Sequence, residues 1–422
     1  MHSNWKKNTA LFLTSQTISL FGSSLVQYAI LWYITLNTQS GLMMTLSIIC
    51  GFVPTFLLSP FAGVWADRYS RKLLIILSDS CIAAATLILA LLFLIGYNEM
   101  WLLFVVSAVR ALGAAVQTPA VGAMLPQIVP KEQLTKLNGI NGSIQALIML
   151  LSPMLSGALL TVASIEVIFF IDVITAVLAV ATMLLFVKVP LHAKAVAKQN
   201  LSYFSDMRLG IRYITQHHYI RTFLIFMAFF LVLAAPVAFL TPLQVTRTFG
   251  GDIWRLTAIE ITFSIGMMIG GGILAGWKGF RNRVYTMTMS ALAMGAFTFA
   301  LGFIPVFWIY LLFMGLFGLA MPFFSTPGTV LLQERVEPDY MGRVFGVLGM
   351  ISSSMMPFGM LIFGPLADAV KIEWMLMLTG LLMFILGLFL LGSKALVKAG
   401  EPAPAAIDTD DRQYTPQQTA GL

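Results

Sequence analysis

Four ionisable side chains stand inside long apolar stretches of the sequence, and each of them could bind or move a proton. They are Asp79, Arg110, Asp172 and Glu260. A charge at the centre of a bilayer costs about 2.5–3.5 kcal/mol, so each needs a partner, a wet cavity or a neutral state. Burial disfavours the charged form of a carboxylate, which favours proton uptake there. We therefore expect these side chains to take part in proton coupling, whereas Asp368, at the end of a stretch, should simply be solvated.

A second group of charges occupies the segment "GVWADRYSRK" (63–72), between two long apolar stretches. Its charged residues are Asp67, Arg68, Arg71 and Lys72. Cations beside a membrane span set its orientation, but acids contribute little to topology. A carboxylate beside a helix start is stabilised by the unpaired N–H groups there, by about 0.3–1 kcal/mol when exposed. The cations alone could serve topology, and the acid favours a contact with a helix start.

The composition indicates which elements must position these charges. Apolar residues make up 59% of the 422 positions and charged residues 10%, against roughly 25% charged in an average soluble domain. A helix needs roughly 20 apolar residues to cross a bilayer, and only helices or closed barrels can cross it. The sequence predicts an all-α membrane protein with twelve transmembrane helices, at 9–36, 42–66, 73–95, 101–125, 136–163, 165–187, 220–246, 255–277, 284–304, 306–332, 342–367 and 372–394.

A polar linker divides these spans into two groups of six. We expect an N-terminal six-helix bundle at 1–187, a cytoplasmic linker at 188–219, a C-terminal six-helix bundle at 220–395 and a disordered tail at 396–422. Two related stretches, "TPAVGAMLPQIVP" (118–130) and "TPGTVLLQERVEP" (326–338), indicate a duplicated, pseudo-symmetric unit. The apolar residues of the linker recur at helical spacing and predict an amphipathic segment on the membrane surface: Leu201, Phe204, Met207, Ile211 and Ile214.

The distribution of charge predicts the orientation of the chain. The formal net charge is +7, but nearly all of the 25 Lys and Arg residues fall on one side of the twelve spans. That asymmetry predicts that both termini are cytoplasmic, and it argues against a nucleic-acid partner. Cys50 and Cys81 fall inside spans with nothing else to pair with or ligate, so we expect neither a disulfide nor a metal site.

Twelve spans, a linker between halves and the pattern G-x-x-x-D-R-x-x-R-K resemble the major facilitator superfamily. The pattern is matched at Gly63, Asp67, Arg68, Arg71 and Lys72. Within that superfamily, "QTISLFGSSLVQYAILWYIT", "VPKEQLTKLNG" and "PDYMGRVFG" resemble the drug-exporter branch that includes the macrolide efflux proteins of bacteria. The resemblance implies a multi-pass protein of the bacterial inner or cytoplasmic membrane that functions as a monomer.

The resemblance also implies a cytoplasmic latch. Asp67 and Arg68 would contact the start of helix 11, which should begin near Gly342 with Arg343 as a second partner. In this superfamily helices 1, 4, 7 and 10 line the central cavity. Arg110, on helix 4, should therefore be a cavity charge. Glu260, on helix 8, is expected to carry a proton because burial favours the neutral form of its carboxyl group, and the glycines that follow it allow helix movement. Asp79 and Asp172, on helices 3 and 6, have a second interpretation as structural partners within the first half.

Few polar side chains are available to orient a ligand in such a cavity. Helix 7 has almost none between Thr222 and Thr241, and the chain holds 32 Phe and 25 Met, which favours a lipophilic substrate. The polar candidates are Gln16, Gln27, Tyr28 and Gln145. Pro153 and Pro357 interrupt helices 5 and 11 at comparable places. Each is either a static kink or a bend needed for rocking.

These observations predict a secondary active exporter of lipophilic drugs, driven by proton antiport, with macrolide-like antibiotics favoured. One proton moving down about 120 mV yields roughly 2.8 kcal/mol, enough for about a hundredfold gradient. No nucleotide-binding loop occurs, so we expect no cofactor and no enzymatic activity; cooperation with a separate ATPase subunit stays open. The alternative is uptake or exchange of a physiological solute, or movement of membrane lipid, by the same fold.

Overall fold

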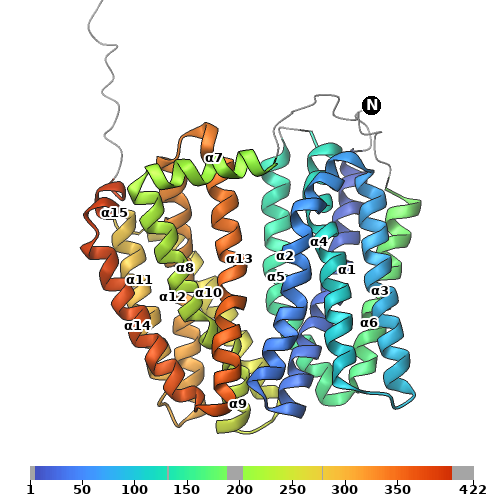
Figure 1. Ribbon diagram of the computed structural model, residues 1–422. Helices are drawn as coiled ribbons and strands as arrows, with labels where there is room; N and C mark the ends of the chain where they lie inside the picture. Colours follow the sequence, from blue (N-terminus) through green and yellow to red (C-terminus); the bar gives the residue numbers. More distant parts are fainter. Residues whose placement is uncertain (1–4, 131–132, 188–202, 278, 402–422) are drawn as a thin grey trace, which may run out of the picture.

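The computed structural model describes residues 5–130, 133–187, 203–277 and 279–401, which form fifteen α-helices and no strands (Figure 1). Twelve stretches within these ranges are long and apolar enough to cross a membrane. Their positions agree with the twelve spans expected from the sequence. The fold is therefore that of an all-α membrane protein, and its helices run side by side between two opposite faces.

Six helices form the first half of the molecule. They are α1 (Trp5–Thr38), α2 (Gly41–Arg68), α3 (Arg71–Leu94), α4 (Met100–Ile128), α5 (Leu134–Val162) and α6 (Ile165–Leu185). Helix α1 packs against α6 and α5, while α4 packs against α2 and α3. The buried side chains of this half gather in two apolar clusters, one around Phe169 and one around Phe12.

The second half repeats this plan with one additional break. Its helices are α8 (His218–Phe239), α9 (Thr241–Thr248), α10 (Ile253–Trp277), α11 (Arg283–Leu301), α12 (Phe307–Arg335), α13 (Pro338–Ala369), α14 (Ile372–Gly392) and α15 (Lys394–Ala399). The span predicted over 220–246 corresponds to His218–Thr248, within which the chain breaks at Leu240 between α8 and α9. Pro242 stands in the first turn of α9, where a proline is well tolerated.

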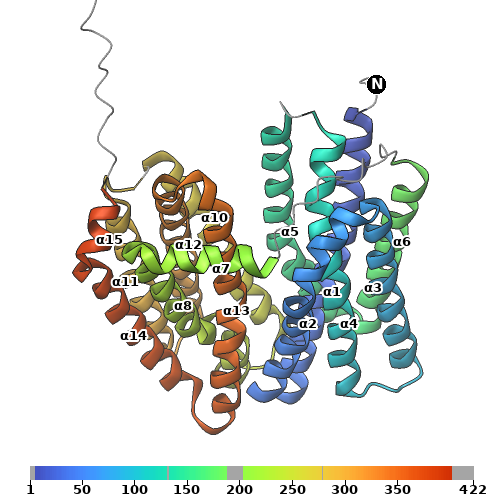
Figure 2. The same cartoon turned by 45° about the horizontal axis from the view of Figure 1, so that its top comes forward.

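Helix α7 (Tyr203–Gln216) lies across the ends of the other helices (Figures 1 and 2). It falls in the predicted amphipathic segment, and Ile214 is buried while Ile211 is exposed; Leu201 and the side chains of Phe204 and Met207 lie outside the described residues. The ring of Tyr213 stacks on Tyr340 of α13, with centroids 4.2 Å apart. The helix is thereby attached to the second half.

Part of the segment expected to be a disordered tail is helical. Residues 396–399 belong to α15, and Leu396 is buried in the core of the second half. The side-chain amide of Asn282 donates to the carbonyl of Val397 at 2.8 Å. The boundary placed at 395 therefore falls inside a packed helix, and residues 402–422 lie outside the described part.

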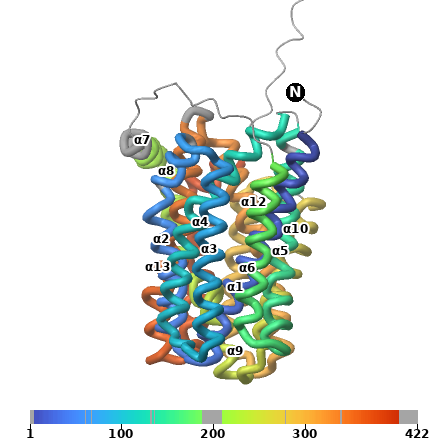
Figure 3. The backbone as a smooth tube through the Cα atoms, turned by 90° about the vertical axis from the view of Figure 1, so that its right-hand side faces the viewer, coloured from blue at the N-terminus to red at the C-terminus, as the bar shows by residue number. Residues whose placement is uncertain are grey.

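The two halves meet at one end of the molecule and separate at the other. We call the end that carries α7 the linker face and the opposite end the α9 face (Figures 1 and 3). Helices α2 and α13 pack together at the α9 face, where Thr45 donates to the carbonyl of Met360 at 3.1 Å. At the linker face nothing lies within 4 Å of a Cβ added at Gly63 or Gly342. The described conformation is thus closed at the α9 face and open at the linker face.

Candidate functional site

A cavity of about 620 Å³ lies between the two halves. Helices α1 and α5 line it on one side, and α8 to α13 line it on the other. Five phenylalanines and six methionines line it: Phe230, Phe239, Phe263, Phe317, Phe324, Met149, Met267, Met294, Met314, Met321 and Met356. Unbranched methionines can repack around ligands of different shapes. The cavity therefore suits apolar molecules of varied outline.

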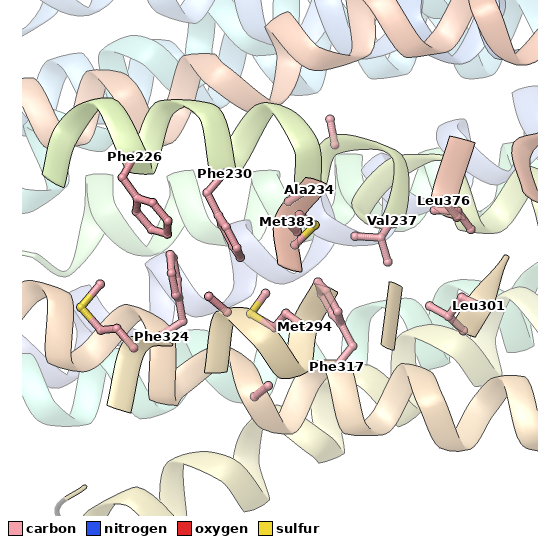
Figure 4. Packing of buried hydrophobic residues seen from close by; sticks show 14 of the residues in the cluster. Phe226, Phe230, Ala234, Val237, Met294, Leu301, Phe317, Phe324, Leu376 and Met383 are labelled. Atoms are coloured by element: carbon pink, nitrogen blue, oxygen red, sulfur yellow. The ribbon is translucent and has the colours of Figure 1, made fainter. Parts of the chain in front are cut away.

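Helix α8 supplies an entirely apolar wall to this cavity. Its lining residues are Phe230, Leu231, Ala234, Val237, Ala238 and Phe239, in agreement with the lack of polar side chains in this part of the sequence. Phe230 stacks on Phe324 of α12, with ring centroids 4.3 Å apart and planes at 21° (Figure 4). Phe226 extends the stack on α8, 5.6 Å from Phe230. These rings fix the wall in place.

Polar groups enter the cavity mainly from the first half. Of the residues singled out in the sequence, Gln27, Tyr28 and Gln145 line it, together with Ser24. Gln16 does not line the cavity. It lies eleven residues before Gln27 on α1, which places it about 16 Å nearer the linker face. Its side-chain nitrogen is buried without a hydrogen-bond partner among the described residues. A role of these groups in ligand binding stays a prediction.

Glu260 of α10 is the one acidic or basic side chain among the described residues that line the cavity. No hydrogen bond or ion pair reaches its carboxylate within the described part of the chain. Tyr28, across the cavity on α1, lies near enough to interact with it electrostatically. An unpaired acid in an apolar cavity is costly to keep charged. Glu260 is therefore placed where a proton or a cationic group would be held.

Arg110 lies inside the first half and is not among the residues that line the cavity. Its guanidinium forms an ion pair with Asp172 of α6 and donates to the hydroxyl of Thr86 and to the carbonyl of Ser23. Asp172 has no exposed surface and also accepts from Thr86 at 3.1 Å. The expectation of a cavity charge on helix 4 is thus not met, because the acid of helix 6 holds the guanidinium inside the bundle.

Asp79 of α3 is a second buried acid in the first half. One of its oxygens accepts from Ser19 of α1 at 2.8 Å and from Gln117 of α4 at 2.6 Å. Its other oxygen is buried without a partner among the described residues. The interior of this half therefore holds two carboxylates and one guanidinium. A coupling role for Asp79 and Asp172 stays a prediction, alongside the structural role that these contacts give them.

The cations of the 63–72 segment contact their own half in this conformation. Arg71 donates to the carbonyl of Ala123 at 2.7 Å, and Lys72 donates to the carbonyls of Leu184 and Val187 at 3.2 and 2.9 Å. They thus tie the start of α3 to the ends of α4 and α6, where cations complement the helix dipole. Arg68 is exposed.

The predicted cytoplasmic latch falls partly outside the described residues. The side chain of Asp67 lies outside the described part of the structure, and the space around Gly63 and Gly342 is open. Arg343 packs against Gly210 of α7 and against the ring of Tyr340. Because the halves are apart at the linker face, the described state leaves the latch hypothesis as a prediction about the opposite state.

Asp368, expected to be solvated, instead joins the two halves at the α9 face. It stands near the end of α13, and its carboxylate accepts from the hydroxyl of Ser40 at 2.8 Å and from the N–H groups of Gly41 and Leu42 at 2.7 and 2.9 Å. Arg247 of α9 contacts the same carboxylate at 3.1 Å. Asp368 is exposed, as expected, but it is not merely solvated, because packing brings the start of α2 to its carboxylate. No local sequence signal marks a partner 328 residues away.

The two prolines predicted to bend helices lie beside contacts that hold the bundles together. Pro153 stands within α5, where Ser156 donates to the carbonyl of Leu25 at 3.2 Å. Pro357 stands within α13 next to the cavity residue Met356, and Gly359 faces the carbonyl of Val232. These two contacts lie within one half each. Helices α5 and α13, which contain the prolines, also pack against helices of the other half. The role of the prolines in rocking stays a prediction.

Comparisons with known proteins agree with this architecture. A family model described as the Major Facilitator Superfamily matches residues 12–360. Macrolide efflux protein A of Streptococcus pyogenes is 31% identical over 389 residues, which cover 92% of this chain and 96% of that protein. Macrolide efflux protein A of Enterococcus faecalis is 32% identical over 323 residues, which cover 76% of this chain and 99% of that protein.

Solved structures share the fold at lower identity. A bacterial homolog of the human lysosomal transporter Spinster, in an inward-facing and unoccupied conformation, superposes with a TM-score of 0.70. It is 13% identical, and the match covers 96% of this chain and 100% of that one. The relatives and the fold are those of transporters, and the twelve apolar helices are those of a multi-pass membrane protein. The chain belongs to the major facilitator superfamily.

Proposed function

We propose that the protein exports lipophilic drugs, with macrolide-like antibiotics favoured, by alternating access coupled to proton antiport. The observation that carries this proposal is the Phe- and Met-lined cavity between the halves, with Glu260 as its charged lining residue. Its volume of about 620 Å³ falls within the roughly 300–1,000 Å³ of drug-sized sites. The two relatives named macrolide efflux proteins support the same substrate class.

The proposed outward direction of transport rests on the two relatives named efflux proteins, and the predicted orientation of the chain assigns the two faces. Nearly all Lys and Arg residues lie toward the linker face, so we assign this face to the cytoplasm of a bacterial cell membrane. The described conformation would then admit a drug from the cytoplasm or the inner leaflet. Closure of the linker face and opening of the α9 face would release the drug outside.

Proton coupling is assigned first to Glu260. Its carboxylate is costly to charge in the empty cavity, so it takes a proton when no cationic substrate is near. That proton enters from the outside after the drug has left, the protonated carrier turns back to face the cytoplasm, and the proton is released there when the next cationic drug binds. Asp79 is the second candidate, because the described interior side chains of the first half include two carboxylates and one guanidinium, and one Asp79 oxygen lacks a hydrogen-bond donor among the described residues. The proton gradient is the energy source, and no cofactor is proposed.

The alternative is a carrier of the same fold that takes up or exchanges a physiological solute or moves lipid. An apolar cavity fits a lipid chain as well as a drug, whereas a sugar or amino-acid carrier should present more hydrogen-bonding groups. We propose a monomer as the working unit. The test below also decides whether export depends on a separate ATPase subunit.

Expression in a drug-sensitive bacterium tests the proposal. Cells that make the protein should accumulate several-fold less labelled macrolide than cells that make Glu260→Gln, and an uncoupler should remove the difference. Glu334→Gln is a matched control, because Glu334 pairs with Arg283 away from the cavity. Accumulation unaffected by the protein would refute drug export. Export that survives the uncoupler but fails when ATP is depleted would replace proton antiport with dependence on an ATPase.

A further inference from the structure

Asp368 and Arg247 form a connected set of hydrogen bonds across the two halves at the α9 face. Three donors of the first half reach the Asp368 carboxylate, namely the Ser40 hydroxyl and the N–H groups of Gly41 and Leu42. These N–H groups lie in the first turn of α2, where backbone N–H groups find no acceptor within their own helix. The carboxylate thus caps a helix of the other half and meets the positive end of its dipole.

Arg247 strengthens this contact from a third helix. Its guanidinium donates to the carbonyl of Ala367 on α13 at 2.6 Å and to the carbonyl of Gln39, which belongs to the first half. It also pairs with Asp368 itself. One side chain therefore binds both halves and neutralises the acid between them.

Close backbone packing lies directly beneath these hydrogen bonds. A Cβ added at Gly41 would lie 2.2 Å from the carbonyl oxygen of Gly364, and one added at Gly364 would lie 1.6 Å from the hydroxyl of Thr45. Such spacing leaves no room for side chains or water between α2 and α13. The Asp368 contacts are thus made only while the two helices touch at this end.

We propose that Asp368 and Arg247 form a latch that holds the α9 face closed, as the counterpart of the latch predicted at the linker face. Helices α2 and α13 run antiparallel, since α2 starts and α13 ends at the α9 face. Asp67 is the penultimate residue of α2, and Asp368 is the penultimate residue of α13. Each acid therefore stands at the end of its own helix, and Asp368 contacts the start of the other helix in the described conformation.

This arrangement keeps the two states of a carrier close in free energy. Rocking breaks the hydrogen bonds of Asp368 at one face, and the same motion brings Asp67 to the start of α13 at the other. A loss at one end is offset by a gain of the same chemistry at the opposite end. A small ligand-dependent difference can then shift the equilibrium. The inference rests on the alternating access proposed above.

Distances between spin labels can measure both faces without any substrate. In a background with Cys50→Ala and Cys81→Ala, labels at the exposed positions Tyr97 and Val306 report on the α9 face. Labels at Phe186 and Phe280, also exposed, report on the linker face. The protein is reconstituted in lipid nanodiscs. The ratio of molecules open at the α9 face to molecules closed there is then read from the distance distribution.

Asp368→Asn should raise this ratio about tenfold, the factor expected when hydrogen bonds to a charged group are weakened. Arg247→Gln should shift it in the same direction, and Asp67→Asn in the opposite direction. The double variant Asp67→Asn with Asp368→Asn should return toward the wild-type ratio. Glu373→Gln is the matched control, since Glu373 lies at the same face but accepts from Thr248 within its own half.

Unchanged ratios in both Asp368→Asn and Arg247→Gln would overturn the latch, as would an equal shift in Glu373→Gln. The shift needs no drug, so it separates this inference from the proposed function. A protein that shifts as expected but exports no macrolide retains the latch and loses the assigned substrate. A protein that exports macrolide with unshifted ratios retains the function and loses the latch.

Discussion

The backbone N–H of Gly41 donates a hydrogen bond of 2.7 Å to the carboxylate of Asp368, although the two residues are 327 positions apart. One lies at the start of α2 and the other near the end of α13, so the bond joins the two halves. It forms at the face opposite to the one where the cavity opens between the bundles. The conformation of this transporter is therefore maintained by contacts at the closed end.

Gly41→Ala should impair closure of the α9 face, because the added Cβ would lie 2.2 Å from the Gly364 carbonyl oxygen. Backbone atoms cannot move aside as a flexible side chain can, so α2 and α13 should separate. We expect drug export to fall about tenfold, a change equivalent to about 1.4 kcal/mol, and expression to stay normal. Efflux of a labelled macrolide from cells measures the change.

Gly51→Ala is the control on the same helix, since nothing lies within 4 Å of a Cβ added there. It should export at the wild-type rate. Equal activity of Gly41→Ala and Gly51→Ala would show that close packing of α2 on α13 is not needed for transport.

Asp172→Asn should destabilise the first half, because it leaves the Arg110 guanidinium without its anionic partner inside the bundle. Removing one member of a buried ion pair costs about 3–5 kcal/mol. We expect a clear fall in the melting temperature of the purified protein in detergent. Asp252→Asn is the comparison: its own side chain is exposed and pairs with the partly buried Arg255, and pairs near the surface contribute about 0–1 kcal/mol. Similar melting temperatures for the two variants would argue against a stabilising role for the buried pair.

Phe230→Ala should weaken drug binding, since Phe230 lines the cavity and stacks on Phe324. An aromatic contact of this kind contributes roughly 0.5–1.5 kcal/mol, so its loss should raise Kd by about two- to tenfold. Phe229→Ala changes the same residue type one position away, where 61% of the side chain is exposed. Equilibrium binding of a labelled macrolide to both purified variants checks this. An equal Kd for both would exclude the α8 wall from the binding site.

Much of the fold could be predicted from the sequence, because the length and polarity of a membrane helix are local properties. Hydropathy located all twelve spans, and their boundaries needed only small changes. The break at Leu240 was missed although Pro236 and Pro242 flank it, since apolar residues continue through it without interruption. The apolar wall of α8 was visible for the same reason.

The pairing of charges could not be predicted, because it depends on how the helices pack. Arg110 looked like a cavity residue by its helix number, yet Asp172 holds it inside the first half. Asp368 looked solvated by its position at a helix end, yet it caps a helix of the other half. Gln27, Tyr28 and Gln145 do share one cavity, since they lie at similar depths on neighbouring helices, whereas Gln16 is too near the linker face.

The central claim is that protons drive drug movement through the cavity that contains Glu260. Purified protein in liposomes tests it directly. An imposed pH gradient should drive labelled macrolide against its concentration gradient, in the direction opposite to proton flow. Glu260→Gln should lose this driven movement while retaining binding within a few-fold. Macrolide movement that is the same with and without the pH gradient, or the same in wild type and Glu260→Gln, would contradict the account.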